Sequence, residues 1–234
     1  KYASELVCDS HEIRRRWQRD FGRDGVFIPY GGDIPQRLPV ESGLSPRQYI
    51  LLVARFVPEN TVPEFIEAAR ELSKRWDVVI VGSSGYGGEI ELAVERLASE
   101  SSRVQWLGHV SDDARLFSLW QHSGVYFHGH SVGGTNPALV QAMACGAPIV
   151  ARDTVYNREV LGPNGIFAEP TAESIVQTIS RTLESGGNLE TLSANAELRA
   201  SQDYSWKSIC EKYESLIGSC SRTAVMQKSQ MGLE

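Results

Sequence analysis

Short runs of apolar and β-branched residues alternate with longer amphipathic stretches from about residue 48 onward. We predict strands at residues 50–54, 78–81, 104–107, 125–127, 149–151 and 165–167, with helices in the stretches between them. This alternation predicts an α/β fold, a Rossmann-like parallel sheet with helices on both faces. Ligands of such sheets bind beyond the carboxyl ends of the strands. The loops after residues 54, 81, 107 and 127 are therefore the expected site.

Residues that cap helices give the expected helix limits. Pro63 lies in the first turn of a predicted helix over residues 62–75. A second helix follows the Gly/Ser-rich loop 82–88 and ends near residue 98. Ser111 is the expected N-cap of the third helix, because its hydroxyl can accept a hydrogen bond from a free backbone N–H.

The segments that flank the predicted sheet have their own patterns. These are a strand at 6–7, a helix at 10–21, a strand at 26–28, and helices at 188–200 and 206–217, the last capped by Ser205. We divide the chain into the last unit of an amino-terminal domain (1–30), a Gly/Pro-rich linker (31–47), the Rossmann-like domain (48–200), a carboxy-terminal helix (201–218) and a tail (219–234).

Composition and charge argue against several classes of protein. The 234 residues include 23 Lys and Arg against 29 Asp and Glu, a net charge of −6, which argues against a nucleic-acid partner. The longest clearly apolar run, residues 49–54, is far shorter than the ~20 residues of a transmembrane helix. Four scattered cysteines form no Cys-x-x-Cys pair. They predict neither a zinc site nor a disulfide framework, and they favour a reducing cytoplasm.

The loop after the strand at 125–127 has the pattern of an anion site. Gly133 and Gly134 allow the backbone to approach a ligand closely. Asn136 is the expected N-cap of the following helix, Pro137 suits its first position, and Gly146 ends it. Such a helix directs free N–H groups and a partial positive charge at the strand ends, which suits phosphate. A helix that is only well capped is the alternative.

Charged and titratable side chains lie in the same predicted region. Arg55 follows the first strand of the sheet, where a guanidinium can hold phosphate oxygens with two donors. An ion pair with Glu59 is the alternative for this arginine. His128 and His130 can donate to a phosphate or a sugar. Two histidines without a third ligand nearby do not predict a metal site.

The Gly-rich loop 82–88 loosely resembles a dinucleotide fingerprint, because it follows a strand and precedes a helix. Its spacing is not Gly-x-Gly-x-x-Gly, and no acidic residue ends a strand about 20 residues further on. An NAD-dependent oxidoreductase is therefore the weaker alternative function.

Two stretches together resemble the donor-binding half of a GT-B glycosyltransferase of family 4, or group 1. Residues 54–61 are similar to the family's Gly-Arg-x-x-x-x-Lys-Gly segment, and residues 133–146 to its Glu-Gly-Phe-Gly…Glu-Ala-Met-Ala-Cys-Gly segment. Residues 10–33 resemble the end of the amino domain with its linker. Residues 203–206 resemble the start of the last helix, which crosses back to that domain. The resemblance covers about residues 1–218.

The chain departs from the family pattern at three positions. The family lysine falls on Asn60, the first glutamate on Gly133 and the second on Gln141. The variants Ala-Arg-Phe-x-Pro-Glu-Asn and Gly-Gly-Thr-Asn-Pro resemble a rhamnosyltransferase-like branch that takes part in polysaccharide assembly.

The resemblance implies a site for an activated sugar. Arg55 would be the catalytic group, because it stabilises the charge that develops on the leaving diphosphate. The residues implied at the diphosphate are Arg55, Asn60, Gly133, Gly134, Thr135 and Asn136, and those at the base and ribose are Gly82, Val110 and Gln141. Metal-independent binding is expected, because no Asp-x-Asp occurs and a helix N-terminus with Arg55 already supplies positive potential.

The implied reaction moves a hexosyl-type sugar from a nucleotide-diphosphate sugar to a glycan or lipid-linked acceptor, with retention, in polysaccharide biosynthesis. An amino-terminal acceptor domain would bind the acceptor. Since residues 1–30 are only its last unit, we expect the chain alone to be inactive. The full-length enzyme is expected in the cytoplasm, with peripheral association at the inner face of the cell membrane as a further location. A non-catalytic nucleotide-sugar-binding module is the main alternative function.

Overall fold

The computed structural model describes residues 5–185 and 189–230. Residue 188, the first of one predicted helix, and residues 231–234 of the predicted tail lie outside the described residues.

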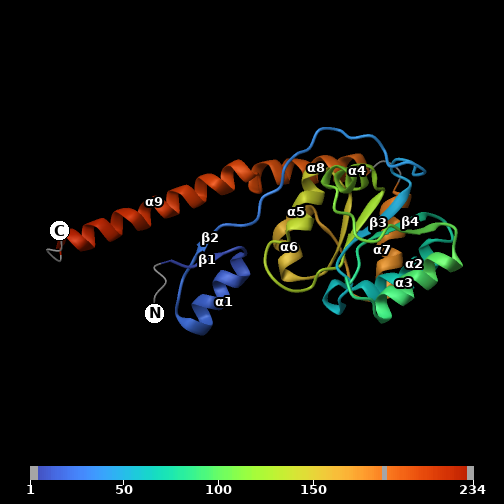
Figure 1. Ribbon diagram of the computed structural model, residues 1–234, viewed down its shortest axis with the longest axis horizontal. Helices are drawn as coiled ribbons and strands as arrows, with labels where there is room; N and C mark the ends of the chain where they lie inside the picture. Colours follow the sequence, from blue (N-terminus) through green and yellow to red (C-terminus); the bar gives the residue numbers. More distant parts are fainter. Residues whose placement is uncertain (1–4, 186–188, 231–234) are drawn as a thin grey trace.

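A six-stranded parallel sheet forms the core of the domain over residues 49–168 (Figure 1). Its strands are β3 (Tyr49–Val53), β4 (Asp77–Val81), β5 (Val104–Trp106), β6 (Val125–His128), β7 (Ile149–Arg152) and β8 (Ile166–Ala168). The spatial order is β5-β4-β3-β6-β7-β8, so the chain builds outward from β3 in one direction and then returns to add β6 beside it. The α/β fold with a parallel sheet predicted from the sequence is confirmed.

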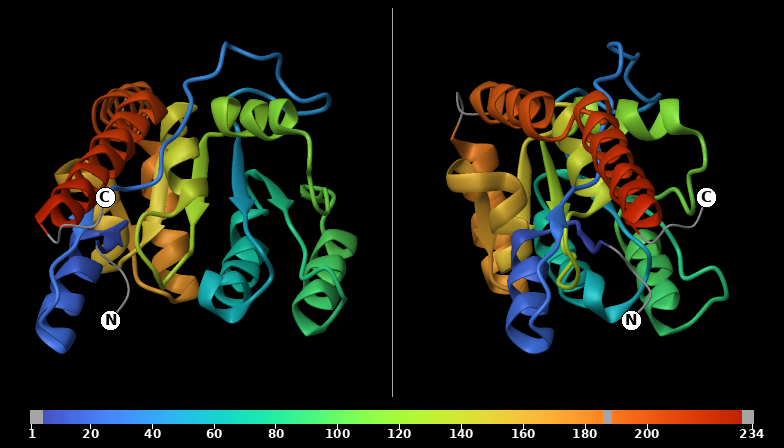
Figure 2. Two further views of the ribbon diagram at one scale, coloured as in Figure 1. Left: turned by 60° about the vertical axis from the view of Figure 1, so that its left-hand side comes forward. Right: turned by 90° about the vertical axis from the view of Figure 1, so that its left-hand side faces the viewer.

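Helices cover both faces of this sheet (Figure 2). They are α2 (Val62–Leu72), α3 (Glu89–Glu100), α4 (Asp113–His122), α5 (Pro137–Ala144), α6 (Val155–Leu161), α7 (Ala172–Glu184) and α8 (Leu189–Asp203), with short 3-10 turns at η1 (Pro58–Asn60) and η2 (Gly162–Asn164). Apolar residues of α2, α3 and α7 share one core cluster, and those of α4, α5, α6 and α8 share the other.

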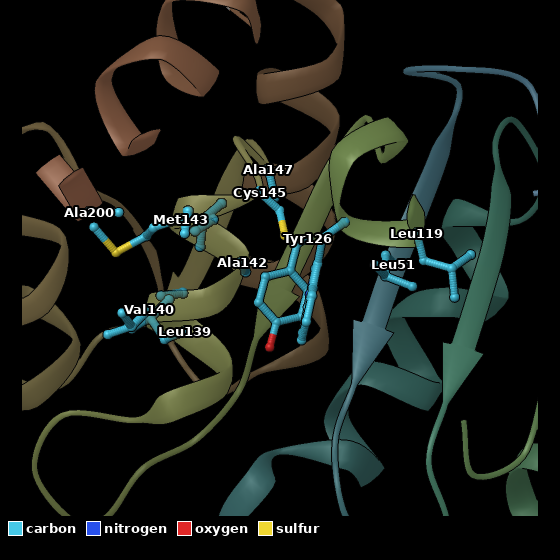
Figure 3. Close-up of a cluster of buried hydrophobic side chains, with 14 of the residues drawn as sticks. Leu51, Leu119, Tyr126, Leu139, Val140, Ala142, Met143, Cys145, Ala147 and Ala200 are labelled. Carbon is cyan, nitrogen blue, oxygen red and sulfur yellow. The ribbon is translucent and has the colours of Figure 1, made fainter. Parts of the chain in front are cut away.

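Successive strand residues enter opposite core clusters, as the period of two in a β-strand requires. Ile50 and Leu52 pack against the α2 side, whereas Leu51 and Tyr126 pack against the α5 side, where Figure 3 shows Leu51 and Tyr126 with Leu119. Both faces are covered, so a buried strand such as β3 is apolar at every position rather than alternately. This packing holds the loops at the carboxyl ends of β3 and β6 in fixed positions.

The amino-terminal unit has a sheet of its own. It contains β1 (Val7–Cys8), α1 (His11–Phe21) and β2 (Val26–Phe27), and β1 pairs with β2 in parallel. Ser10 caps α1, and the Glu159 carboxylate of α6 also accepts hydrogen bonds there from the His11 amide (2.7 Å) and the Glu12 amide (3.2 Å). A carboxylate at a helix N-terminus is favoured by the free N–H groups, so this contact fixes the unit against α6.

Several helix limits differ from the predicted ones. Asp112, not Ser111, caps α4, because its carboxylate accepts from the amides of Ala114 (2.9 Å) and Arg115 (3.4 Å). Helix α2 ends at Leu72 instead of residue 75. Helix α8 continues to Asp203, past the domain boundary expected at 200.

Helix α9 (Trp206–Gln230) is longer than the predicted helix and includes most of the expected tail 219–234. Gly218 does not stop it, since an isolated glycine costs a helix only about 1 kcal/mol and no proline follows. The helix begins beside the linker, where Gly32 forms a bridge with Ser205, and runs out along the amino-terminal unit (Figures 1 and 2), where Lys212 lies over the Phe27 ring. As expected, the Ser205 hydroxyl accepts from the Ser208 amide in its first turn (3.4 Å).

Candidate functional site

The carboxyl ends of β3 and β6 lie side by side at the point where the strand order reverses. The β3–α2 loop and the β6–α5 loop diverge there, and such a switch point is where open α/β sheets bind ligands. A cavity of about 270 Å³ opens between the loops. Its lining consists of Val53, Ala54, Arg55, Asn60, His128, Gly129, His130, Asn136, Pro137 and Ala138. Of the site residues expected from the sequence, it brings together Arg55, Asn60, His128, His130 and Asn136.

The two loops are in direct contact at Gly129. A Cβ atom on this glycine would overlap the Asn60 carbonyl oxygen, so only glycine allows the approach. Thr61 Oγ1 donates to the Gly129 carbonyl oxygen (2.5 Å) and accepts from Arg152 Nη1 (3.0 Å). Thr61 has a φ of 58°, in the left-handed region that favours glycine. The hydrogen bonds hold this strained residue, and with it the relative position of the loops.

Arg55 supplies the charge of the cavity. Its side chain is exposed, and within residues 5–185 and 189–230 its guanidinium has no ion pair or hydrogen bond. The alternative ion pair with Glu59 is therefore absent from the part of the chain that the structure describes. The guanidinium is free to bind an anion that enters between the loops.

Asn60 is 7% exposed, and both ends of its amide are used within the site. Its Nδ2 donates to the Arg55 carbonyl oxygen (2.9 Å), and its Oδ1 lies 2.6 Å from His130 Nδ1. In this arrangement Asn60 positions His130.

His128 is 4% exposed and stands at the end of β6. Its Nδ1 lies 3.0 Å from the Tyr126 hydroxyl, while its Nε2 is buried and has no hydrogen-bond partner among the described residues. Burial lowers the pKa of His128 to about 3, and the nearby His130 acts in the same direction, so the ring is neutral at pH 7. A buried nitrogen left without a partner beside a cavity indicates a place for a polar ligand group.

The loop before α5, residues 129–136, is called the glycine loop below. Some of its polar groups bond within the protein, and others have no partner among the described residues. Asn136 caps α5 as predicted, accepting from the amides of Ala138 (2.9 Å) and Leu139 (3.4 Å). Thr135 donates both its amide (3.3 Å) and its hydroxyl to the Asp9 carbonyl oxygen. The amides of Gly133 and Gly134 have no partner in the described part of the chain. They are the loop amides left for an anion.

Asp9 contacts the loop before α5, although it does not line the cavity and the sequence did not indicate this contact. It lies between β1 and α1, and a Cβ atom on Gly134 would overlap its carboxylate. Burial raises the pKa of this carboxyl group. The contact joins sequence positions 9 and 134, and a pattern within either segment carries no sign of it.

The residues expected at the base and ribose lie outside this cavity. Gly82 follows β4 with a φ of 131°, and a Cβ atom there would overlap the Ala54 carbonyl oxygen. Val110 is 9% exposed and packs in the α5-side core. Gln141, on α5, pairs with the linker: its Oε1 accepts from the Asp33 amide (3.1 Å) and its Nε2 donates to the Asp33 carbonyl oxygen (2.7 Å).

Replacement of Gln141 by leucine should lower the free energy of unfolding by about 1 kcal/mol, because the linker loses both hydrogen bonds. Thermal or urea unfolding measures this, with Gln177→Leu on the exposed face of α7 as the control. Unchanged unfolding together with weaker nucleotide binding would instead assign Gln141 to the ribose, as the sequence resemblance implied.

Comparison with known proteins agrees with this fold. The model of the family "Glycosyl transferases group 1" matches residues 37–199, and the chain belongs to this family. An uncharacterized glycosyltransferase of Methanocaldococcus jannaschii is 26% identical over 165 residues, which are 68% of this chain and 41% of that protein. The phosphatidyl-myo-inositol mannosyltransferase of Mycobacterium leprae is 30% identical over 162 residues, which are 64% of this chain and 41% of that protein.

Among solved structures, Anabaena Alr3699/HepE in complex with UDP matches with a TM-score of 0.79 and 22% identity, over 93% of this chain and 64% of that one. The fold is thus that of GT-B glycosyltransferases. The chain spans about two fifths of the length of the curated relatives named above. Among the described residues, no helix is long and apolar enough to cross a membrane, and no cluster of His, Cys, Asp and Glu could hold a metal ion.

Proposed function

We propose that this chain is the carboxy-terminal, donor-binding part of a retaining, hexosyl-type glycosyltransferase of a rhamnosyltransferase-like branch. The donor is a nucleotide-diphosphate sugar, and the acceptor is a glycan or a lipid-linked molecule in polysaccharide biosynthesis. One observation carries the proposal: an Arg55 guanidinium and a buried His128 Nε2, both without a partner among the described residues, line the same switch-point cavity. The UDP bound in the Anabaena structure supports the class of donor.

The diphosphate would bind between the Arg55 guanidinium and the free amides of Gly133 and Gly134. The base and ribose would extend toward Gly82 and Val110 at the end of β4, with Gln141 as the proposed ribose contact if its amide leaves the linker. When the bond from the sugar to the diphosphate breaks, negative charge grows on the phosphate oxygens. Fixed donors that face this charge stabilise the transition state without having to reorganise.

The acceptor would bind on an amino-terminal domain, to which residues 1–30 contribute the last unit, with α9 crossing back to it. A GT-B site is a cleft between two halves, so residues 1–234 alone are expected to bind the donor without transferring sugar. The whole enzyme would meet a lipid-linked acceptor by peripheral association with the membrane. Turnover of the full-length protein with a panel of activated sugars separates this proposal from a non-catalytic nucleotide-sugar-binding module.

Donor binding should not need a divalent metal, because Arg55 and the α5 N-terminus supply the positive potential. Calorimetry with UDP, GDP and dTDP, with and without EDTA, should give the same dissociation constant, on the order of 10 µM to 1 mM for an open site. NAD serves as the control ligand. Binding that EDTA abolishes would contradict the phosphate site, and tight binding of NAD alone would favour the oxidoreductase alternative.

A further inference from the structure

The switch-point cavity has less positive charge than a diphosphate requires. Of the residues that line it, only Arg55 is permanently cationic, whereas the diphosphate of a nucleotide sugar has two negative charges. Resting on the donor site proposed above, we infer that His130 takes up a proton from solvent when the diphosphate binds and provides the second positive charge. The neutral imidazole becomes an imidazolium, and no other bond is made or broken.

The hydrogen bonds of Asn60 determine which nitrogen of His130 is available. Asn60 Nδ2 donates to the Arg55 carbonyl oxygen (2.9 Å), which orients the amide so that Oδ1 faces His130 Nδ1 at 2.6 Å. A carbonyl oxygen only accepts, so Nδ1 must hold a hydrogen atom. In the neutral ring, Nε2 therefore has the lone pair and is the nitrogen that can take up a proton.

His130 Nε2 lies on the side of the glycine loop. It is the atom nearest to the place where a Cβ on Gly133 would stand, at 3.8 Å. The free amides of Gly133 and Gly134 belong to the same loop, and Arg55 lines the cavity together with His130. The backbone of His130 is fixed as well, because Asn157 Nδ2 of α6 donates to its carbonyl oxygen (2.9 Å). A protonated Nε2 would thus meet the anion beside the donors already placed there.

The groups around His130 favour its neutral form before a ligand binds. Burial lowers its pKa below the ordinary value of 6.5, and the positive charge of Arg55 acts in the same direction. The Val132 carbonyl oxygen and the Glu59 carboxylate oppose them. His128, two residues earlier at the end of β6, is uncharged at pH 7. A bound diphosphate reverses this balance, because two negative charges favour the imidazolium.

Proton uptake links affinity to pH. Where binding takes up one proton, affinity rises up to about tenfold for each unit by which the pH falls. The rise occurs between the pKa of His130 in the complex and its lower pKa in the free protein. Above this window the proton contributes nothing, and below it the ring is already charged.

The test uses nucleotide sugars, because the terminal phosphate of a free nucleoside diphosphate itself titrates at about pH 6. Binding of UDP-glucose, GDP-mannose and dTDP-rhamnose is first compared at pH 8. The nucleotide sugar with the highest affinity is then titrated calorimetrically from pH 5.5 to 8.5. At each pH, two buffers with different ionisation enthalpies give the number of protons taken up. The parent chain should take up close to one proton in the steep part of the profile.

His130→Gln should remove the uptake and leave a flat profile at the affinity that the parent shows at high pH. Asn60→Asp gives a second measurement that does not depend on removing the ring. Its carboxylate beside Nδ1 would protonate His130 in the free protein, so the window should move to higher pH. The control is His11→Gln, which replaces an exposed histidine of α1 that stacks on Phe27 of β2 and should keep the parent profile.

Two outcomes would overturn the inference in distinguishable ways. A parent chain that binds a nucleotide sugar with no proton uptake contradicts the role of His130 and leaves the donor site in place. A parent chain that binds none of the three nucleotide sugars between pH 5.5 and 8.5 contradicts the proposed function, and the inference with it.

Discussion

Replacing Arg55 by alanine should weaken nucleotide-sugar binding by about ten- to a hundredfold, equivalent to ~1.5–3 kcal/mol, because one charge-assisted contact with the diphosphate is lost. The structure strengthens this expectation, since the guanidinium lines the cavity and has no partner among the described residues. Asn60 cannot take over its role, because its amide is bonded to the Arg55 carbonyl oxygen and lies against His130.

The stability of the Arg55→Ala variant should be close to that of the parent, within about 0.5 kcal/mol, because the exposed side chain makes no contact that folding depends on. Calorimetry and thermal unfolding together separate the two effects. Arg96→Ala on the exposed side of α3 is the matched control, since it removes the same charge away from the cavity. A folded Arg55→Ala chain with the affinity of the parent would show that the diphosphate does not bind between these loops.

The sheet could be predicted from the sequence because its signal is local. A buried parallel strand is apolar at every position, and β3 shows this within five residues. The start of α5 is local too, because the Asn136 side chain and Pro137 act within one turn. Where neighbouring residues compete for one role, the prediction was wrong by a residue: Ser111 and Asp112 can both cap a helix, and the carboxylate of Asp112 is the one that does.

The partners within the candidate site could not be predicted, because they depend on how distant loops pack. Asn60 and His130 are far apart in sequence, and only the close approach at Gly129 brings the amide to the ring. Asp9 reaches the glycine loop because Glu159 fixes α1 against α6. The sequence therefore indicated five residues that line the switch-point cavity, Arg55, Asn60, His128, His130 and Asn136. It did not indicate that Gly133, Gly134 and Thr135 lie outside that lining, or that Asn60 would orient a histidine.

Gly129→Ala should have the largest effect on the site, because it disrupts the backbone contact between the two loops. The new Cβ would overlap the Asn60 carbonyl oxygen and stand 3.0 Å from Thr61 Cβ, so the two loops must separate. Separation breaks the hydrogen bond from Thr61 Oγ1 to the Gly129 carbonyl oxygen. Overpacking of this kind costs about 1–3 kcal/mol of stability.

The same displacement would move Arg55 and His130 apart across the cavity, so nucleotide-sugar binding should fall by more than the hundredfold expected for Arg55→Ala. The control is Gly22→Ala at the end of α1, where φ is 63° and nothing lies within 4 Å of the new Cβ. That change strains the backbone by about 1 kcal/mol without a clash and should leave affinity intact. Thermal unfolding of both variants measures the loss of stability, and calorimetry measures the loss of nucleotide-sugar affinity. If Gly129→Ala melted and bound like the parent, the β3–α2 and β6–α5 loops would not depend on this contact, and the geometry of the donor site would have to be maintained elsewhere.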